Sequence, residues 1–221
     1  MCFSPQADLV GGLVLGVVGV DVVRHVNKRR NHLLFAALPL LLAAHQVDEA
    51  FVWWGLQGDF SADVGRVATW VYLIFAFVLL PVYVPVAVFA LEPKGRRRLS
   101  IAPFVVLGLV VSGLLLAAMV RGPVTAALGM HHVAYGTGLR SGTLVVGAYV
   151  TATCGALLFS GSRNIALYGV VNLVAVVVLA RLTIDGFASL WCAWAAISSG
   201  AFALHLRFGG SPRSGALAAT E

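Results

Sequence analysis

Two acidic residues lie within strongly apolar segments of the chain, Glu49 in AAHQVDEAFVWW and Asp185 in RLTIDGFASLWCAW. A carboxyl group at membrane depth is costly, and such groups mostly face a bundle interior, a cavity or an ion path. Tryptophans accompany both acids, Trp53 and Trp54 in the first segment, Trp191 and Trp194 in the second. An acid among aromatic rings, away from water, is suited to proton-transfer chemistry.

Burial away from water favours the neutral form of a carboxyl group. A protonated Glu49 would therefore act as a general acid toward an epoxide or an alkene. The faces of aromatic rings would stabilise the resulting carbocation, and a water-poor site would protect it from quenching. Asp185 would orient Glu49 or accept the final proton. The residues expected to shape the pocket are His45, Asp48, Trp53, Trp54, Trp70, Tyr72, His131, His132, Trp191 and Trp194.

This chemistry is typical of polyprenyl cyclisation, with a prenylated hydrophobic substrate entering from the lipid bilayer. No cofactor is expected, because the chain has no DDxxD-like acidic cluster to hold Mg²⁺. Within the first segment, His45, Glu49 and Trp53 are spaced by four residues and share one helix face. Asp48 lies about 100° round the helix from Glu49. It is three residues from His45 and could contact the imidazole.

Three other interpretations of these residues remain open. Both acids could be structural, with Asp185 capping the start of the last helix. His45 and Glu49 also have a spacing that suits a shared metal ion, and such a site would indicate a membrane hydrolase. The ligands that could complete it are His131, His132, Asp185 and Cys2. In the third interpretation the chain is a ligand or proton-coupled carrier, and Glu49 is its titrating group.

Composition indicates an integral membrane protein. Of the 221 residues, 60% are hydrophobic and 11% are charged, whereas soluble domains have about 25% charged residues. The net charge of +6 comes from basic clusters between apolar segments. This placement indicates membrane topology, so no nucleic-acid partner is expected. The three cysteines, Cys2, Cys154 and Cys192, have neither disulfide nor metal-site spacing.

A membrane-spanning helix needs about 20 apolar residues. This criterion predicts an all-α bundle of seven spans, forming one domain over residues 1–207. A disordered tail is expected over 208–221, and a polar and aromatic loop over 121–141. The predicted spans are 8–26, 32–56, 66–91, 101–120, 142–160, 164–181 and 184–206.

Basic residues predict the orientation of the bundle. Eleven lysines and arginines lie in the first, third and fifth connections and the tail, and four lie on the opposite side. Since cytoplasmic loops are enriched in Lys and Arg, the N-terminus is expected outside and the C-terminus in the cytoplasm. The expected location is the inner (cytoplasmic) membrane of a bacterium.

The opening MCFSPQADLVGG resembles the MCFS-type start of a family of small bacterial membrane proteins. HQVDEAFVWW is similar to the Q-x-x-E-x-x-x-W segment of that family's second helix. The size, the seven spans and the two separated acids also resemble the membrane-bound terpene cyclases of meroterpenoid and indole-terpenoid pathways, of the pyripyropene, drimentine and xiamycin types. That resemblance implies cyclisation started by protonation of a prenylated indole or aromatic substrate. It also implies that Glu49 and Asp185 are the essential acids.

Overall fold

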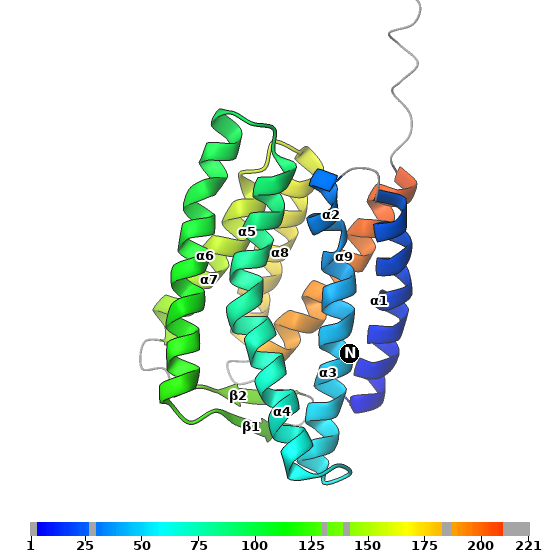
Figure 1. Cartoon of the computed structure of the whole chain (residues 1–221), viewed down its shortest axis with the longest axis vertical. Helices are drawn as coiled ribbons and strands as arrows, with labels where there is room; N and C mark the ends of the chain where they lie inside the picture. The colour runs from blue at the N-terminus through cyan, green and yellow to red at the C-terminus, as the bar shows by residue number, and fades with distance from the viewer. Residues whose placement is uncertain (1–3, 27–29, 130–131, 139–141, 183–186, 210–221) are drawn as a thin grey trace, which may run out of the picture.

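The computed structural model describes residues 4–26, 30–129, 132–138, 142–182 and 187–209, and it is a helical bundle (Figure 1). Its elements in chain order are α1 (Pro5–Val26), α2 (Arg30–Ala36), α3 (Leu38–Gln57), α4 (Ala62–Leu73), η1 (Ile74–Leu79), α5 (Leu80–Leu91), α6 (Arg96–Arg121), β1 (Thr125–Leu128), β2 (Val133–Gly136), α7 (Gly142–Leu158), α8 (Arg163–Leu182) and α9 (Phe187–Gly209).

Six helical stretches in the described residues are long and apolar enough to cross a membrane. They are Pro5–Val26, His32–Gln57, Ala62–Leu91, Arg96–Arg121, Arg163–Arg181 and Phe187–His205. A shorter apolar helix, α7, has 17 residues. Each of the seven predicted spans overlaps one of these stretches. The helical character of the fold is therefore confirmed.

Two of the long stretches are interrupted at prolines. In the second, α3 begins at Leu38 with Pro39 in its first turn, where the missing N–H of proline is tolerated. In the third, the π-helical turn η1 precedes Pro81, which cannot donate the regular i→i−4 hydrogen bond. The hydroxyl of Tyr149 donates to the η1 carbonyl of Ala76 at 2.9 Å. Ser112 donates to the carbonyl of Val78 at 2.7 Å, so side chains of α6 and α7 bind the backbone of this turn.

Residues 121–141 differ from the predicted loop, because they contain the antiparallel pair β1 and β2, in which Thr125 pairs with Gly136. Side chains two residues apart on a strand share a face. Val133 and Tyr135 therefore both pack against the helical core, and Val133 is fully buried. The strands lie across one end of the bundle (Figure 1). We call this end, with the α3–α4 connection, the hairpin end.

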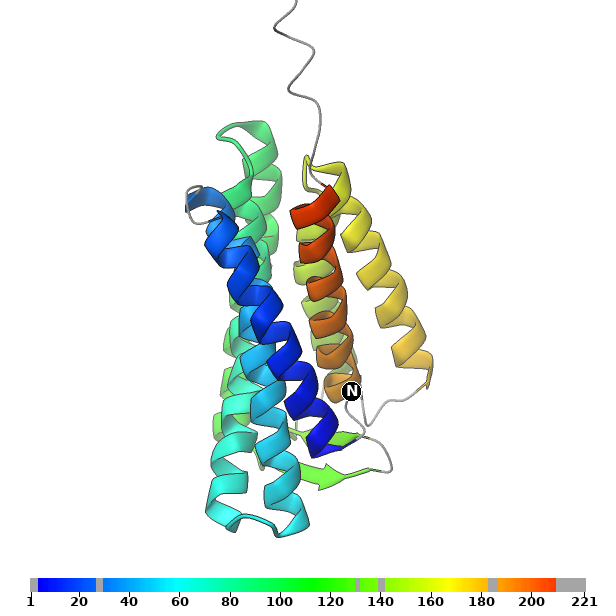
Figure 2. The same cartoon turned by 90° about the vertical axis from the view of Figure 1, so that its right-hand side faces the viewer.

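The opposite end of the bundle carries the α5–α6 connection at 92–95 and the α7–α8 connection at 159–162 (Figures 1 and 2). Described arginines there are Arg24, Arg96, Arg97, Arg98 and Arg163. We call it the basic end.

Helices α1 and α3 pack closely along their length (Figure 2). A Cβ atom added at Gly12 would lie 2.8 Å from Cγ2 of Val47 and 2.9 Å from the carbonyl oxygen of Ala43. Only glycine permits this approach of the two backbones. The contact places the first turn of α1 beside the hairpin-end half of α3, which carries Glu49.

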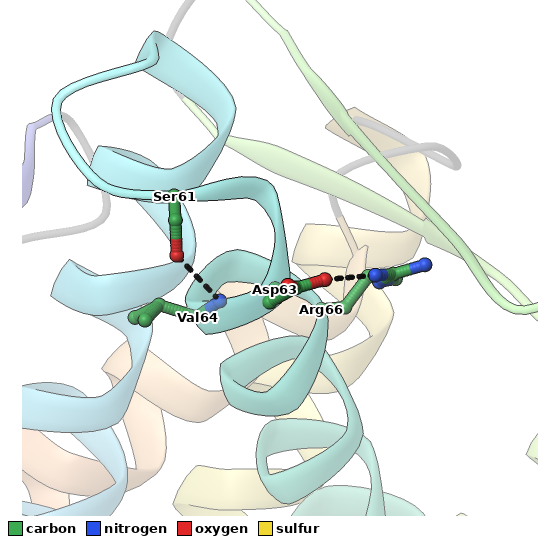
Figure 3. A network of polar contacts seen from close by, with 4 residues as sticks. All are labelled: Ser61, Asp63, Val64 and Arg66. Atoms are coloured by element: carbon green, nitrogen blue, oxygen red, sulfur yellow. Dashed lines mark hydrogen bonds and ion pairs between the residues drawn. The ribbon is translucent and has the colours of Figure 1, made fainter.

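The direction of α4 is fixed where it starts at the hairpin end. Ser61 has extended backbone angles, and its hydroxyl accepts a hydrogen bond from the N–H of Val64 at 3.4 Å (Figure 3). Serine in this conformation is a favoured N-cap. Asp63 and Arg66 form an exposed ion pair in the following turn. With its start fixed, α4 runs back along α3 and brings Tyr72 level with His45.

The outward faces of several helices are apolar. They carry exposed Val10, Leu13, Val14 and Val17 on α1, Leu109, Val110 and Leu114 on α6, and Val170, Val171, Val174, Val177 and Val178 on α8. Contiguous exposed apolar faces of this kind mark surfaces that contact a membrane or a partner.

Candidate functional site

Glu49 is fully buried in the middle of the hairpin half of the bundle. The hydroxyl of Ser189, also fully buried, donates a hydrogen bond to its Oε1 at 2.6 Å. This bond joins α3 to the first turn of α9. The Glu49 carboxyl is thus enclosed by protein and held away from water.

Four aromatic rings form a continuous stack that includes His45, one helical turn before Glu49 on α3. Tyr135 of β2 stacks on Tyr72 of α4 at 4.3 Å between ring centroids, and Tyr72 stacks on His45 at 4.1 Å. His45 then stacks on Phe75 of η1 at 4.3 Å. The stack presents ring faces contributed by four different elements. Because Phe75 lies in the π-helical turn, that turn helps to set the stack, and such turns are frequent at functional sites.

His45 packs as an aromatic ring in this stack. Neither of its nitrogens makes a hydrogen bond within the described part of the chain. The expected contact between Asp48 and the imidazole is therefore not formed. Asp48 instead lines a groove on the outside of α3 and α4 with Phe51 and Val64, because the helical step of about 100° turns it away from Glu49.

Asp8 is a second fully buried acid in this half of the bundle, and the sequence interpretation missed it. Its carboxyl lies beside the indole of Trp53. Neither Asp8 oxygen, nor Nε1 of Trp53, nor the amide of fully buried Gln46 has a hydrogen-bond partner among the described residues. Buried polar groups without partners cost about 1–3 kcal/mol each.

A signal for Asp8 was present in the sequence. Asp8 precedes Gly12 by four residues, so both lie on one helix face, and a glycine on a membrane helix marks close packing with a neighbour. The same face therefore carries the acid toward α3.

The predicted tryptophans fall into separate environments. Trp53 is buried in a core cluster with Tyr72 and Cys192. Trp191 is buried among residues of α7, α8 and α9, where Trp194 packs against it at the edge. Trp54 packs edge-on to Phe51 and Phe60 on the outside of the hairpin end. Trp70 is 37% exposed.

The remaining predicted residues are not part of the stack. His132 is half-buried, and its ring lies against Gly129 in the hairpin. Asp185 and His131 lie outside the described residues, as does Cys2. Within the described ranges, no three His, Cys, Asp or Glu side chains are grouped so that they could hold a metal ion. The residues brought together are Glu49, His45, Tyr72 and Trp53, with Asp8, Ser189 and Cys192 added by the structure.

Residues 1–216 match the model of a family of unknown function, DUF6629. The chain belongs to this family. No curated protein and no solved structure matches the chain. The DUF6629 match includes Asp8, Glu49 and Ser189, so the whole buried site lies inside the family's extent.

Proposed function

We propose that the chain is a membrane-embedded terpene cyclase that starts carbocationic ring closure by protonating a prenylated substrate. The observation that carries the proposal is the Glu49 carboxyl, which is fully buried, accepts a hydrogen bond from Ser189 and follows by one helical turn the stacked ring of His45. The resemblance of the HQVDEAFVWW segment adds support at the same residue.

In the proposed reaction, Glu49 gives its proton to the terminal alkene, whose π electrons form the new C–H bond and leave a carbocation. With an epoxide, the proton goes to oxygen and the C–O bond breaks. The next double bond attacks the cation and forms a ring C–C bond. Loss of a proton from carbon to a carboxylate restores an alkene. The product is an isomer of the substrate, and that proton returns to Glu49.

The aromatic stack supports the charged stage of this reaction. Ring faces attract cations and do not react with a carbocation as a free water molecule does. Tyr72 and Phe75 supply such faces on either side of His45. Two carboxylates qualify as the final proton acceptor, Asp185 from the resemblance and Asp8 from its burial in the same half of the bundle.

The proposal includes a seven-span topology in the inner membrane. The N-terminus and the hairpin end would face outside, and the C-terminus and the basic end would face the cytoplasm. Apolar outward faces on α1, α6 and α8 support insertion. The concentration of arginine at the basic end supports the orientation.

The test uses the full chain purified in detergent with farnesyl indole, and in parallel with its terminal epoxide. Products are analysed by mass spectrometry in D₂O, where protonation of the alkene adds one deuteron to the cyclic isomer. Glu49→Gln keeps the shape of the side chain and removes the acid, so cyclisation should fall by at least about 100-fold, the scale of general acid catalysis. Asp63→Asn, at the exposed ion pair on α4, is the matched control and should retain full activity.

Comparing Asp8→Asn with Asp185→Asn identifies the final base. The variant that lacks the base should accumulate alcohols, because water then traps the cation that is not deprotonated. Cyclisation by Glu49→Gln at the rate of the unaltered chain contradicts the proposal.

A proton-coupled carrier is the second candidate, because two carboxyls, Asp8 and Glu49, are buried in one half of the bundle. Proton uptake into vesicles that contain the chain, driven by an added prenylated substrate and lost in Glu49→Gln, would favour the carrier. Turnover of that substrate without proton uptake favours the cyclase.

A further inference from the structure

A cavity of about 390 Å³ opens at the basic end, far from Glu49. Helices α1, α2, α8 and α9 and the α5–α6 connection all contribute to its lining. Its volume falls within the range of about 300–1,000 Å³ that is typical of small-molecule sites. No part of the proposed cyclisation requires this space.

The inner walls of the cavity are apolar. Phe35, Ile165 and Tyr168 come from a buried core cluster, and Phe202 packs against them. Two ring contacts hold Phe202 in place, one with Tyr168 at 4.7 Å and one with Phe35 at 5.9 Å. This part of the cavity suits an aliphatic or prenyl chain and offers it little hydrogen bonding.

The rim is basic. Exposed His25, His32 and Arg97 line it from α1, α2 and α6. One carboxylate, Glu92, also lines the cavity, but its Oε1 already accepts hydrogen bonds from the Ser160 hydroxyl and the Gly161 N–H, both at 2.7 Å. Arg97 donates to the carbonyl of Gly161 at 3.4 Å. That bond uses one of the five guanidinium donors, so the others can bind an anion.

A second, smaller cavity lies next to this one. Leu38 and Tyr168 line both cavities, and the smaller one, of about 40 Å³, reaches Tyr149 and Trp191. Along α3, the 11 residues from Leu38 to Glu49 correspond to about 16 Å.

We propose that this cavity binds an amphiphile that has one anionic head, a phosphate or carboxylate, and a long apolar chain. The head would bind Arg97 at the rim, with His25 and His32 beside it, and the chain would lie against Phe35, Ile165 and Phe202. This site does not depend on Glu49 or on the cyclase proposal. Its ligand is either a single-chain compound or an anionic bilayer lipid.

Binding is measured on the full chain in a sterol-based detergent, which has no alkyl chain to compete. Dodecyl phosphate should raise the Tm saturably and appear as a 1:1 complex by native mass spectrometry. Dodecanol, dodecylamine and inorganic phosphate should bind at least about tenfold more weakly, the loss expected when a charge-assisted hydrogen bond is removed. Arg97→Gln should weaken the binding of dodecyl phosphate by a similar factor. Arg96 does not line the cavity, so Arg96→Gln should leave this binding unchanged.

Ala203→Phe fills the cavity from its apolar wall and should abolish binding. If this variant does not fold, Arg97→Gln still tests the proposal, because Arg97 is exposed and its replacement should not prevent folding. Equal binding of dodecanol or dodecylamine, or an unchanged affinity in Arg97→Gln, overturns the proposal. If phosphatidylglycerol competes with dodecyl phosphate for binding, the ligand is a bilayer lipid. If it does not compete, the ligand is a single-chain compound. Because Glu49→Gln should bind dodecyl phosphate normally, failure of the cyclase proposal is distinguishable from failure of this one.

Discussion

The hydroxyl of Ser189 lies 2.6 Å from Oε1 of Glu49 and donates a hydrogen bond to it across 140 residues of sequence. Both side chains are fully buried, so the bond fixes the carboxyl relative to α9. It is also a contact by which the last helix is held to the helix that carries the acid.

Ser189→Ala should lower the free energy of unfolding by about 1–3 kcal/mol, because the buried Glu49 carboxyl then loses the hydrogen bond that the Ser189 hydroxyl donates. Thermal unfolding in detergent measures the loss. Ser198→Ala is the control on the same helix, since its hydroxyl makes longer bonds of 3.3 Å to Tyr168 and to the carbonyl of Ala195. A loss for Ser189→Ala no greater than for Ser198→Ala would show that the Glu49 bond is unimportant.

Alanine substitutions at two helix glycines should change stability in opposite directions. Gly12→Ala forces a methyl group against Val47 and the backbone of Ala43, and overpacking of this kind costs about 1–3 kcal/mol. Gly113→Ala has nothing within 4 Å of the new methyl group and should gain about 0.5–1 kcal/mol from helix propensity. Chemical unfolding of the two variants in parallel measures the difference. Similar effects at both sites would contradict the close packing of α1 on α3.

His45→Phe should leave the chain as stable as before, since a phenyl ring can occupy the stack between Tyr72 and Phe75. His45→Ala should cost about 3–5 kcal/mol, as other losses of a buried ring do. If His45 instead bound a metal, Phe and Ala would be equally damaging. The comparison of the two Tm values therefore separates the stack from the metal site.

Asp8→Leu should raise the Tm, because a buried carboxyl without a hydrogen bond among the described residues is replaced by an apolar side chain. The same variant should lose cyclisation if Asp8 transfers a proton. Gain of stability with loss of activity is typical of functional residues. A lower Tm would indicate that Asp8 has a structural role.

The topology can be tested with single cysteines in a chain where Cys2 is serine. Asp59→Cys, at the hairpin end, should react with a membrane-impermeant maleimide added to intact cells. Lys94→Cys, at the basic end, should react only after the membrane is opened. Cys154 and Cys192 are buried and should give no background. The reverse pattern would invert the proposed orientation.

The positions of the helices could be predicted from the sequence because each long apolar stretch has about the number of residues that a helix needs to cross a bilayer. The hairpin could not be predicted, since each described strand has four residues and only Ala126, Val133 and Tyr135 of them pack against this core. A pattern that short is indistinguishable from that of a loop. For the site, the i, i+4 spacing placed His45, Glu49 and Trp53 correctly on one inward face. It gave no information on neighbouring helices, so Asp8 and Ser189 were missed.

Two adjacent tryptophans of α3 show what else could not be predicted from the sequence. Trp53 and Trp54 are adjacent, yet one is buried and the other packs outside against Phe60. In the sequence, both are aromatic residues close to Glu49. Only the angular position of each residue on α3 separates them, and that requires knowing which face of the helix meets the bundle.

The π-helical turn has a consequence for how the chain can change over evolution. One additional residue in a helical turn rotates everything beyond it by about 100°. The part of Ala62–Leu91 beyond η1 is therefore rotated by a fixed angle relative to the part before it. The part before η1 directs Tyr72 toward His45, and the part beyond it directs Ala87 and Val88 into the core of the basic end. Deletion of one residue from η1 would restore a regular helix, and it would turn one of these two sets of side chains away from its partners.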